Sequence, residues 1–187
     1  MLTANQRAFA FGLALATAGA TTLAAQNQPT FDKGNRTTVG DWAVECLGND
    51  ESDEVDCQLY QRVLTQDSSV AAMVVALAWS APAKKLLAQV SLPLGSDLTK
   101  PPLLSIDNQI AADFAWSRCV ASGCLIEATL PGSLVAALAE GESATFTVVQ
   151  PNAGGISIPL SLNGFVDGLS QIMPEDALPT QAADESE

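Results

Sequence analysis

Apolar and polar residues alternate in short segments along most of the chain. Residues 57–65 (CQLYQRVLT) are an example, because Leu59 and Val63 alternate with Tyr60 and Arg62, as in a strand with one buried face. Similar segments recur at regular spacing with turn residues between them, and they predict eight or so short antiparallel strands. The segments that we expect to form strands are residues 37–46, 57–65, 70–79, 84–92, 102–106, 111–117, 123–130, 143–150 and 156–160.

The most apolar of these segments, residues 70–79 (VAAMVVALAW), predicts a central strand. It is too short to span a membrane, and its two adjacent valines and Trp79 favour a strand that is buried on both faces or nearly so. Pro82 ends this segment, and residues 84–92 are expected to be its hairpin partner.

Residues 90–124 contain two further apolar segments, 90–94 and 102–106, separated by a Gly-Ser-Asp turn and a pair of prolines. A third strand is expected at residues 111–117, and two cysteines close the stretch. We interpret it as consecutive short strands of one antiparallel sheet, joined by a disulfide at its end.

The hydrophobic period changes in two places from that of a strand to that of a helix. Residues 131–140 (PGSLVAALAE) begin with Pro131 and Ser133 and are followed by Gly141, which are typical helix start and stop signals. Residues 161–172 (SLNGFVDGLSQI) also show helical spacing, with Ser161 as the expected N-cap. The fold class expected is therefore mainly β, an antiparallel sandwich with one or two short helices.

The first residues predict export. Arg7 precedes an apolar run from residue 9 to about residue 20, and Thr22 and Ala24 occupy the −3 and −1 positions of a cleavage site. The run is shorter than the roughly 20 residues that span a bilayer, which argues against a membrane anchor. We expect a signal peptide at residues 1–25, a flexible lead-in at 26–36, the β domain at 37–173 and a disordered acidic tail at 174–187.

The formal net charge is −13, and removal of the signal peptide would take away Arg7 and no acid, giving −14. Such a charge repels phosphate backbones and anionic lipid surfaces, so nucleic acid is excluded as a partner. The acidity is explained equally well by adaptation to a salty habitat or by a basic partner.

The four cysteines, Cys46, Cys57, Cys119 and Cys124, all follow the expected signal peptide. An even number of cysteines in an exported chain indicates disulfides, and four allow three connectivities. We favour Cys46–Cys57 and Cys119–Cys124, because each pair flanks an expected turn, and these bridges would stabilise the fold by roughly 3 and 2 kcal/mol. Zinc binding is the alternative, but the spacings do not match the usual motifs and the chain has no His.

Candidate chemistry is sparse. The absence of His excludes a Ser-His-Asp or Cys-His site and any His-ligated metal. The acidic residues 47–56 do not form an EF-hand, since Val55 and Gln61 stand where the pattern requires Gly and Glu, and an acidic hairpin tip is expected instead. A Ser-Lys pair using Lys84, Lys85 or Lys100 has no supporting sequence context. The sequence nominates no catalytic residue, no cofactor and no metal ligand.

Several short motifs occur in an order that resembles the invasion-associated locus B family of bacterial exported proteins. These motifs are GDWAVEC (40–46), SLPLG (91–95), LLSID (103–107), the two cysteines in CVASGC (119–124) and IPLSLNGF (158–165). The resemblance covers about residues 38–172. It implies an immunoglobulin-like β-sandwich, an extracytoplasmic location, an association with host-cell invasion in some pathogens and no known catalytic residues. Residues 100–102 (KPP) depart from the Gly turn of relatives, and the strong acidity differs from an adhesive basic surface.

We therefore expect a periplasmic or secreted protein that is not an enzyme and binds an unknown protein or envelope component. The mature chain has no expected transmembrane segment. Loops and edge strands of sandwiches can dock partners, and the candidate binding residues are Gly95, Lys100, Pro101 and Pro102, where the prolines would interrupt an edge. The alternatives are an uncharacterised periplasmic hydrolase and an envelope-stress accessory protein.

Export is tested by the N-terminus of the protein recovered from the cell envelope. Mass spectrometry should find a chain that begins at Ala25 or Gln26, because the signal peptidase would cut after the small residues at positions 22 and 24. An envelope-located chain that still carries Met1 would contradict the prediction.

Overall fold

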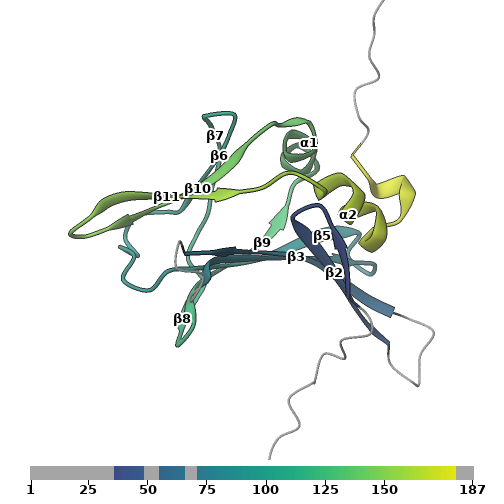
Figure 1. Cartoon of the computed structure of the whole chain (residues 1–187), viewed down its shortest axis with the longest axis horizontal. Coiled ribbons are helices and arrows are strands. Elements are labelled where there is room, and N and C mark those ends of the chain that lie inside the picture. Colours follow the sequence, from purple (N-terminus) through teal and green to yellow (C-terminus); the bar gives the residue numbers. More distant parts are fainter. Residues whose placement is uncertain (1–35, 49–54, 66–70, 180–187) are drawn as a thin grey trace, which may run out of the picture. The chain divides into compact units, whose positions relative to one another are not determined.

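The computed structural model describes residues 36–48, 55–65 and 71–179, and within them eleven strands form two antiparallel sheets (Figure 1). The seven-stranded sheet has the order β1 (Arg36–Val39), β2 (Trp42–Gly48), β3 (Val55–Leu64), β4 (Ala71–Ser80), β5 (Lys85–Leu92), β9 (Gly123–Leu130) and β8 (Arg118–Val120). The four-stranded sheet has the order β11 (Gly154–Leu160), β10 (Ala144–Gln150), β6 (Leu103–Ile106) and β7 (Gln109–Asp113). The helices are α1 (Gly132–Glu140), α2 (Phe165–Ile172) and the short 3₁₀ helix η2 (Glu175–Ala177).

This architecture confirms the mainly β antiparallel sandwich with two short helices. Every second residue of strands such as β5 and β10 is buried and points into the core between the sheets. The core side chains that are almost completely buried include Trp42, Leu59, Met73, Leu92, Ile126, Val148, Phe165 and Leu169. Helix α2 packs on β1, β2 and β3 and completes the layer that faces the larger sheet.

Strand β4 corrects one expectation, because it is not buried on both faces. Met73, Val75 and Leu77 are buried, whereas the residues between them are only half-buried. The outward residues include Ala76 and Ala78, which are apolar but small. A continuous apolar run therefore does not require a second covering layer when most of its outward members are alanines.

Residues 90–124 do not form one sheet as expected. β5 pairs with β9 in the seven-stranded sheet, whereas β6 and β7 belong to the four-stranded sheet, so the chain crosses to the other layer and returns. The crossing uses the loop 93–102, in which Gly95 has a φ of +85°. The strand expected at 111–117 is β7 (Gln109–Asp113), which begins directly after a turn in which Asp107 and Asn108 both have positive φ, as in a tight hairpin.

The expected single strand at residues 37–46 is a hairpin of β1 and β2. Its turn contains Gly40, which has a φ of +57°. Ser161 is also not the N-cap of α2, because that position belongs to Gly164. The Ser161 hydroxyl instead donates to Oδ2 of Asp41 at 2.6 Å, so a tertiary hydrogen bond replaces the expected local one.

The β1–β2 turn and the start of α2 form the tightest contact between distant parts of the chain. A Cβ atom on Gly40 would overlap the backbone carbonyl of Asn163, and one on Gly164, which has a φ of +83°, would overlap the carbonyl oxygen of Val39. The Asp41 N–H also donates to the Asn163 carbonyl at 3.1 Å. Both turns must therefore be glycine turns for the hairpin to reach the helix.

Trp42 and Gln61 extend this contact into the core. The Trp42 indole Nε1 donates to the Ser161 carbonyl at 2.9 Å, and the Trp42 ring lies 5.4 Å from that of Phe165. Gln61, which is 4% exposed, donates its amide to the same carbonyl at 3.0 Å and accepts from the Ser161 N–H at 2.9 Å. We call Gly40, Trp42, Gln61, Ser161 and Gly164 the terminal lock.

Two disulfides join neighbouring strands locally. Cys46–Cys57 links β2 to β3, and Cys119–Cys124 links β8 to β9. Disorder is wrong for residues 174–179, where η2 forms and Leu178 packs against the core. Arg36, expected in a flexible lead-in, belongs to β1. The expected signal peptide at 1–25, residues 26–35, the expected acidic tip at 49–54 and residues 180–187 lie outside the described residues.

None of the described helices has the length and apolar character needed to cross a membrane.

The terminal lock predicts that Gly164→Ala strongly destabilises the domain. The substitution combines left-handed backbone strain with overlap against the Val39 carbonyl, and we expect a loss of about 4 kcal/mol or more in the free energy of unfolding. Gly154→Ala is the matched control, because Gly154 has a φ of +74° but open space around it. It should cost only about 1–2 kcal/mol. Equal losses in urea unfolding of the two variants would show that the close contact is unimportant.

Candidate partner-binding site

The loop between β5 and β6, residues 93–102, presents two leucines to solvent, and we call it the docking loop. Leu94 and Leu98 are each 52% exposed. Large apolar side chains at this exposure have surface to bury against a partner, roughly 1.5–3 kcal/mol for complete burial of one leucine. The loop includes all four binding residues proposed from the sequence.

Hydrogen bonds fix the backbone of the docking loop. The Ser96 hydroxyl donates to the Pro93 carbonyl at 2.9 Å, and the Asp97 N–H donates to the Val149 carbonyl of β10 at 2.7 Å. Oδ1 of Asp97 accepts from the Thr99 N–H at 3.0 Å and from the Thr99 hydroxyl at 2.7 Å. The loop is thus tied to the four-stranded sheet and braced internally.

The Thr99 hydroxyl, followed by the Thr99 N–H, lowers the pKa of Asp97 below its usual value. Asp97 is therefore ionised at neutral pH, and its bonds to Thr99 are charge-assisted, the stronger class of hydrogen bond. A loop ordered before binding loses less entropy when a partner arrives.

The four proposed binding residues divide into two groups. Gly95, Lys100 and Pro101 are exposed, whereas Pro102 is almost fully buried and cannot contact a partner. The Pro102 carbonyl accepts from the Phe114 N–H at 3.0 Å, which anchors the end of the loop. The prolines also do not interrupt a sheet edge, because β6 lies between β10 and β7.

Trp116 links the docking loop to the core. Its indole Nε1 donates to the Lys100 carbonyl at 2.9 Å, and its ring packs partly buried against the core. The sequence analysis did not identify Leu94, Asp97 or Leu98 as binding residues. The available signal was a pair of leucines among turn-forming residues, but exposure cannot be read from that pattern.

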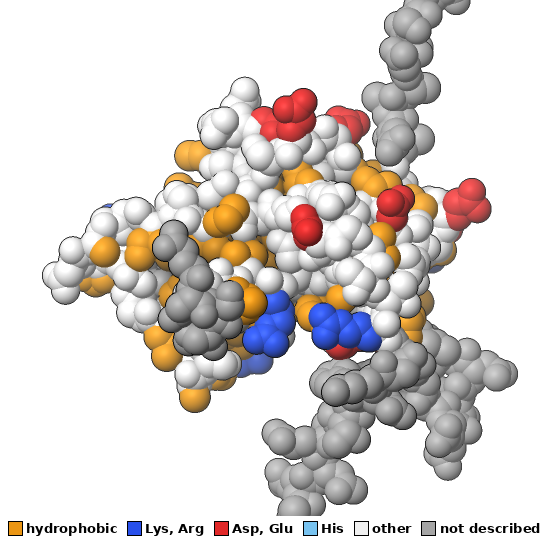
Figure 2. Space-filling view, viewed as in Figure 1, with side chains coloured by type: hydrophobic (Ala, Val, Ile, Leu, Met, Phe, Trp, Pro, Cys, Tyr) orange, Lys and Arg blue, Asp and Glu red, His pale blue; other side chains and the backbone are white. Residues whose placement is uncertain are grey.

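The outward face of the seven-stranded sheet carries a second surface feature, a shallow hollow of about 510 Å³. Ala76 and Ala78 of β4 line it, and Leu87 of β5 beside them is 42% exposed. Small side chains in the middle of the sheet between longer neighbours produce the hollow. Lys and Arg gather on the side formed by this sheet, which also carries Glu45 and Glu127, and further Asp and Glu lie over the helices (Figure 2).

Tyr60 and Glu45 border one end of this face. The Tyr60 hydroxyl donates to Oε1 of Glu45 at 2.9 Å, and the Arg36 guanidinium lies 5.1 Å from the centre of the Tyr60 ring. Burial and then the hydrogen bond to Glu45 raise the pKa of Tyr60. The phenol therefore remains protonated and acts as a hydrogen-bond donor.

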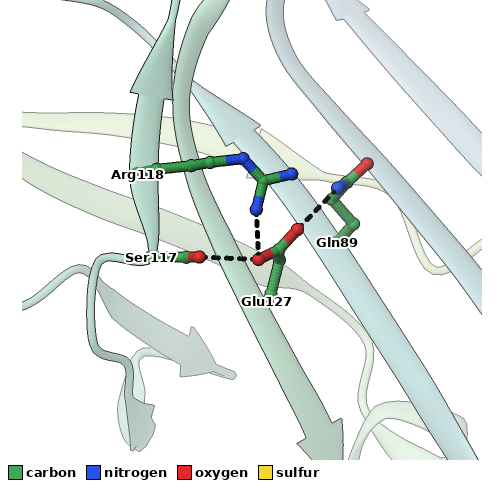
Figure 3. Close-up of polar contacts among 4 residues, drawn as sticks. All are labelled: Gln89, Ser117, Arg118 and Glu127. Atoms are coloured by element: carbon green, nitrogen blue, oxygen red, sulfur yellow. Dashed lines mark hydrogen bonds and ion pairs between the residues drawn. The ribbon is translucent and has the colours of Figure 1, made fainter.

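Glu127 borders the other end and is surrounded by three donors (Figure 3). Its carboxylate accepts from the Ser117 hydroxyl and from Arg118 Nη1, each at 2.6 Å, and from Gln89 Nε2 at 3.1 Å. Ser117, then Arg118 and Gln89, lower the pKa of Glu127. A general acid of a glycoside hydrolase needs a raised pKa, so Glu127 is suited to holding β8 against β9 and not to proton donation.

The Ser161 hydroxyl donates to the Asp41 carboxylate at 2.6 Å, a contact of the same kind as those of Ser117 with Glu127 and Ser143 with Asp107. None of these serines has a histidine base to activate it as a nucleophile, since the chain contains no His. The Ser161 backbone is also engaged by Trp42 and Gln61 in the terminal lock. Among the residues that the structure describes, no three His, Cys, Asp or Glu side chains come together as metal ligands.

Glu127→Gln should change the pH dependence of stability. Because folding lowers the pKa of Glu127, its contribution is fully present above the unfolded pKa, about 4.3, and is lost as pH falls through the folded value. Urea unfolding should therefore show wild type more stable than the variant near pH 6, with the difference shrinking toward about pH 3. Glu140→Gln on α1 makes the same charge change away from this cluster. A wild-type advantage over Glu127→Gln that is constant across this range would contradict the assignment.

Comparison with known proteins identifies the protein family that this chain resembles. The model of the invasion associated locus B (IalB) protein family matches residues 42–173, which include the docking loop and all four cysteines. Invasion protein B homologues from two Brucella abortus strains, 2308 and biovar 1 strain 9-941, are each 28% identical over 144 residues, covering 72% of this chain and 77% of the relative.

A solved structure supports the fold independently. The crystal structure of invasion associated protein B from Bartonella henselae matches with a TM-score of 0.64 at 20% sequence identity, over 73% of this chain and 93% of that chain. This likeness concerns the fold, while the family model rests on sequence. The chain therefore belongs to the invasion-associated locus B family.

Proposed function

We propose that this chain is an exported, non-catalytic binding protein whose docking loop contacts a protein or envelope component. The observation that supports this function best is the pair Leu94 and Leu98, exposed on a backbone that Asp97 holds in place. Exposed apolar side chains on a pre-ordered loop can bury apolar area against a partner at a low entropic cost.

Export to the periplasm or beyond is supported by two lines of reasoning. The pattern around Arg7 is that of a signal peptide, and both cysteine pairs are bridged, which suits an oxidising compartment. These disulfides close local hairpins and would keep short strands paired outside the cytoplasm.

A binding role agrees better than hydrolysis with the chemistry on the described surface. The chain has no imidazole, and the hydrogen bonds around Asp97 and Glu127 lower the pKa of each carboxyl, whereas a general acid near neutral pH needs a raised pKa. The relatives are named as invasion proteins. On the basis of those names, our proposal includes an association with host-cell invasion.

Leu98→Ser and Ile110→Ser form a matched pair that tests the docking loop. Leu98 lies on the loop, whereas Ile110, which is 69% exposed, lies on β7, so each variant removes one exposed apolar side chain. The immobilised mature protein should capture the same envelope partner in wild type and Ile110→Ser. Leu98→Ser should reduce affinity by about tenfold, because burial of one leucine is worth roughly 1.5–3 kcal/mol.

The capture is quantified against envelope extract with a titration of the recovered partner. Combining Leu94→Ser with Leu98→Ser should deepen the loss, and circular dichroism should show that the variants remain folded. A partner that binds all variants equally, or that is lost with Ile110→Ser alone, would place the contact elsewhere and refute the docking loop.

A further inference from the structure

A larger hollow, of about 780 Å³, lies where the β4–β5 turn meets the start of α1 and the segment after α2, and we call it the α1 hollow. Its volume is within the range of about 300–1,000 Å³ that is usual for small-molecule sites. Most of its lining is apolar, including Trp79, Leu86, Leu130, Val135, Met173 and Leu178. It shares no residue with the docking loop.

The charges around the α1 hollow are unusual for this chain. Lys84 and Lys85 line it, and no Asp or Glu does, although the formal net charge is −13. Glu175 and Asp176 are near in sequence to the lining residue Ala177, but they are exposed and do not belong to the lining. The site thus combines an apolar floor with two cations at its edge.

The start of α1 adds a polar feature to the same edge. Gly132 and Ser133, the first residues of the helix, line the hollow, and the N-cap Pro131 provides no side-chain hydrogen bond to the helix N–H groups. Free N–H groups at a helix start favour an anion. They act here in addition to the lysine pair and the apolar lining.

We propose that the α1 hollow binds a single-chain carboxylate amphiphile, a free fatty acid. The alkyl chain lies against Trp79, Leu130 and Met173, and the carboxylate lies near Lys84 and Lys85. The apolar lining disfavours a small hydrophilic anion, and the two lysines disfavour a cationic amphiphile. This ligand site is separate from the docking loop and does not depend on the proposed function.

Isothermal titration calorimetry of the mature protein with monomeric dodecanoate tests the proposal. Dodecanol and dodecyltrimethylammonium have the same alkyl chain and differ in the head group. We expect dodecanoate to bind about tenfold or more tightly than dodecanol, and the cation to give no binding, because only the carboxylate gains from the lysine pair. Equal affinity for all three, or no binding of dodecanoate, would overturn the proposal.

Variants locate the site. Lys84→Gln and Lys85→Gln should each weaken dodecanoate binding by about fivefold, while Lys100→Gln, on the docking loop, should leave it unchanged. Ala136→Leu should abolish binding by filling the hollow, and thermal unfolding checks that this variant is folded. If only Lys100→Gln weakens binding, the ligand lies elsewhere and the proposal fails.

The acidic C-terminus of the chain is the competing occupant. Asp184→Asn, Glu185→Gln and Glu187→Gln, combined in the full mature chain, remove its side-chain carboxylates. We expect the dodecanoate affinity of this triple variant to equal that of wild type. An increase of about tenfold or more would identify the chain's own tail as the occupant of the hollow and would overturn the fatty-acid assignment.

Discussion

The backbone contact between Gly40 and Gly164 determines how the two ends of the domain meet. Each glycine has positive φ, and a side chain on either would overlap the opposite segment. The contact brings the Trp42 indole to the Ser161 carbonyl and its ring beside Phe165. Because α2 packs on β1, β2 and β3, separation of these glycines would also uncover that part of the core.

The terminal lock also explains why the motifs at 40–46 and 158–165 accompany each other. They are the two sides of one contact, and Gln61 of β3 joins them by bonding both the N–H and the carbonyl of Ser161. A buried amide without these partners would cost about 1–3 kcal/mol. The residues that carry the family resemblance here thus define the fold, whereas the exposed leucines of the docking loop lie outside this contact.

Strands were predictable because alternation follows from one-sided burial, and β9 has the bounds expected from its sequence. The sheet to which a strand belongs was not predictable, because β5 and β6 have the same alternation in different layers. Ser161 has a side chain suited to an N-cap, but its hydroxyl donates to the carboxylate of Asp41 instead. The sequence likewise led us to propose binding residues in this loop without distinguishing buried Pro102 from exposed Pro101.

The net charge of the whole chain does not indicate the charge around a single binding site. Arg36, Arg62, Lys85 and Arg118 all lie on strands of the seven-stranded sheet, which also carries Glu45, Asp56 and Glu127, and the helices carry further acids (Figure 2). Charges are screened over about 8 Å at physiological ionic strength, so a ligand responds mainly to its immediate neighbours. A chain with a net charge of −13 can therefore still present a locally cationic site. The partner chemistry follows from which groups the fold brings together, and total acidity mainly limits long-range approach.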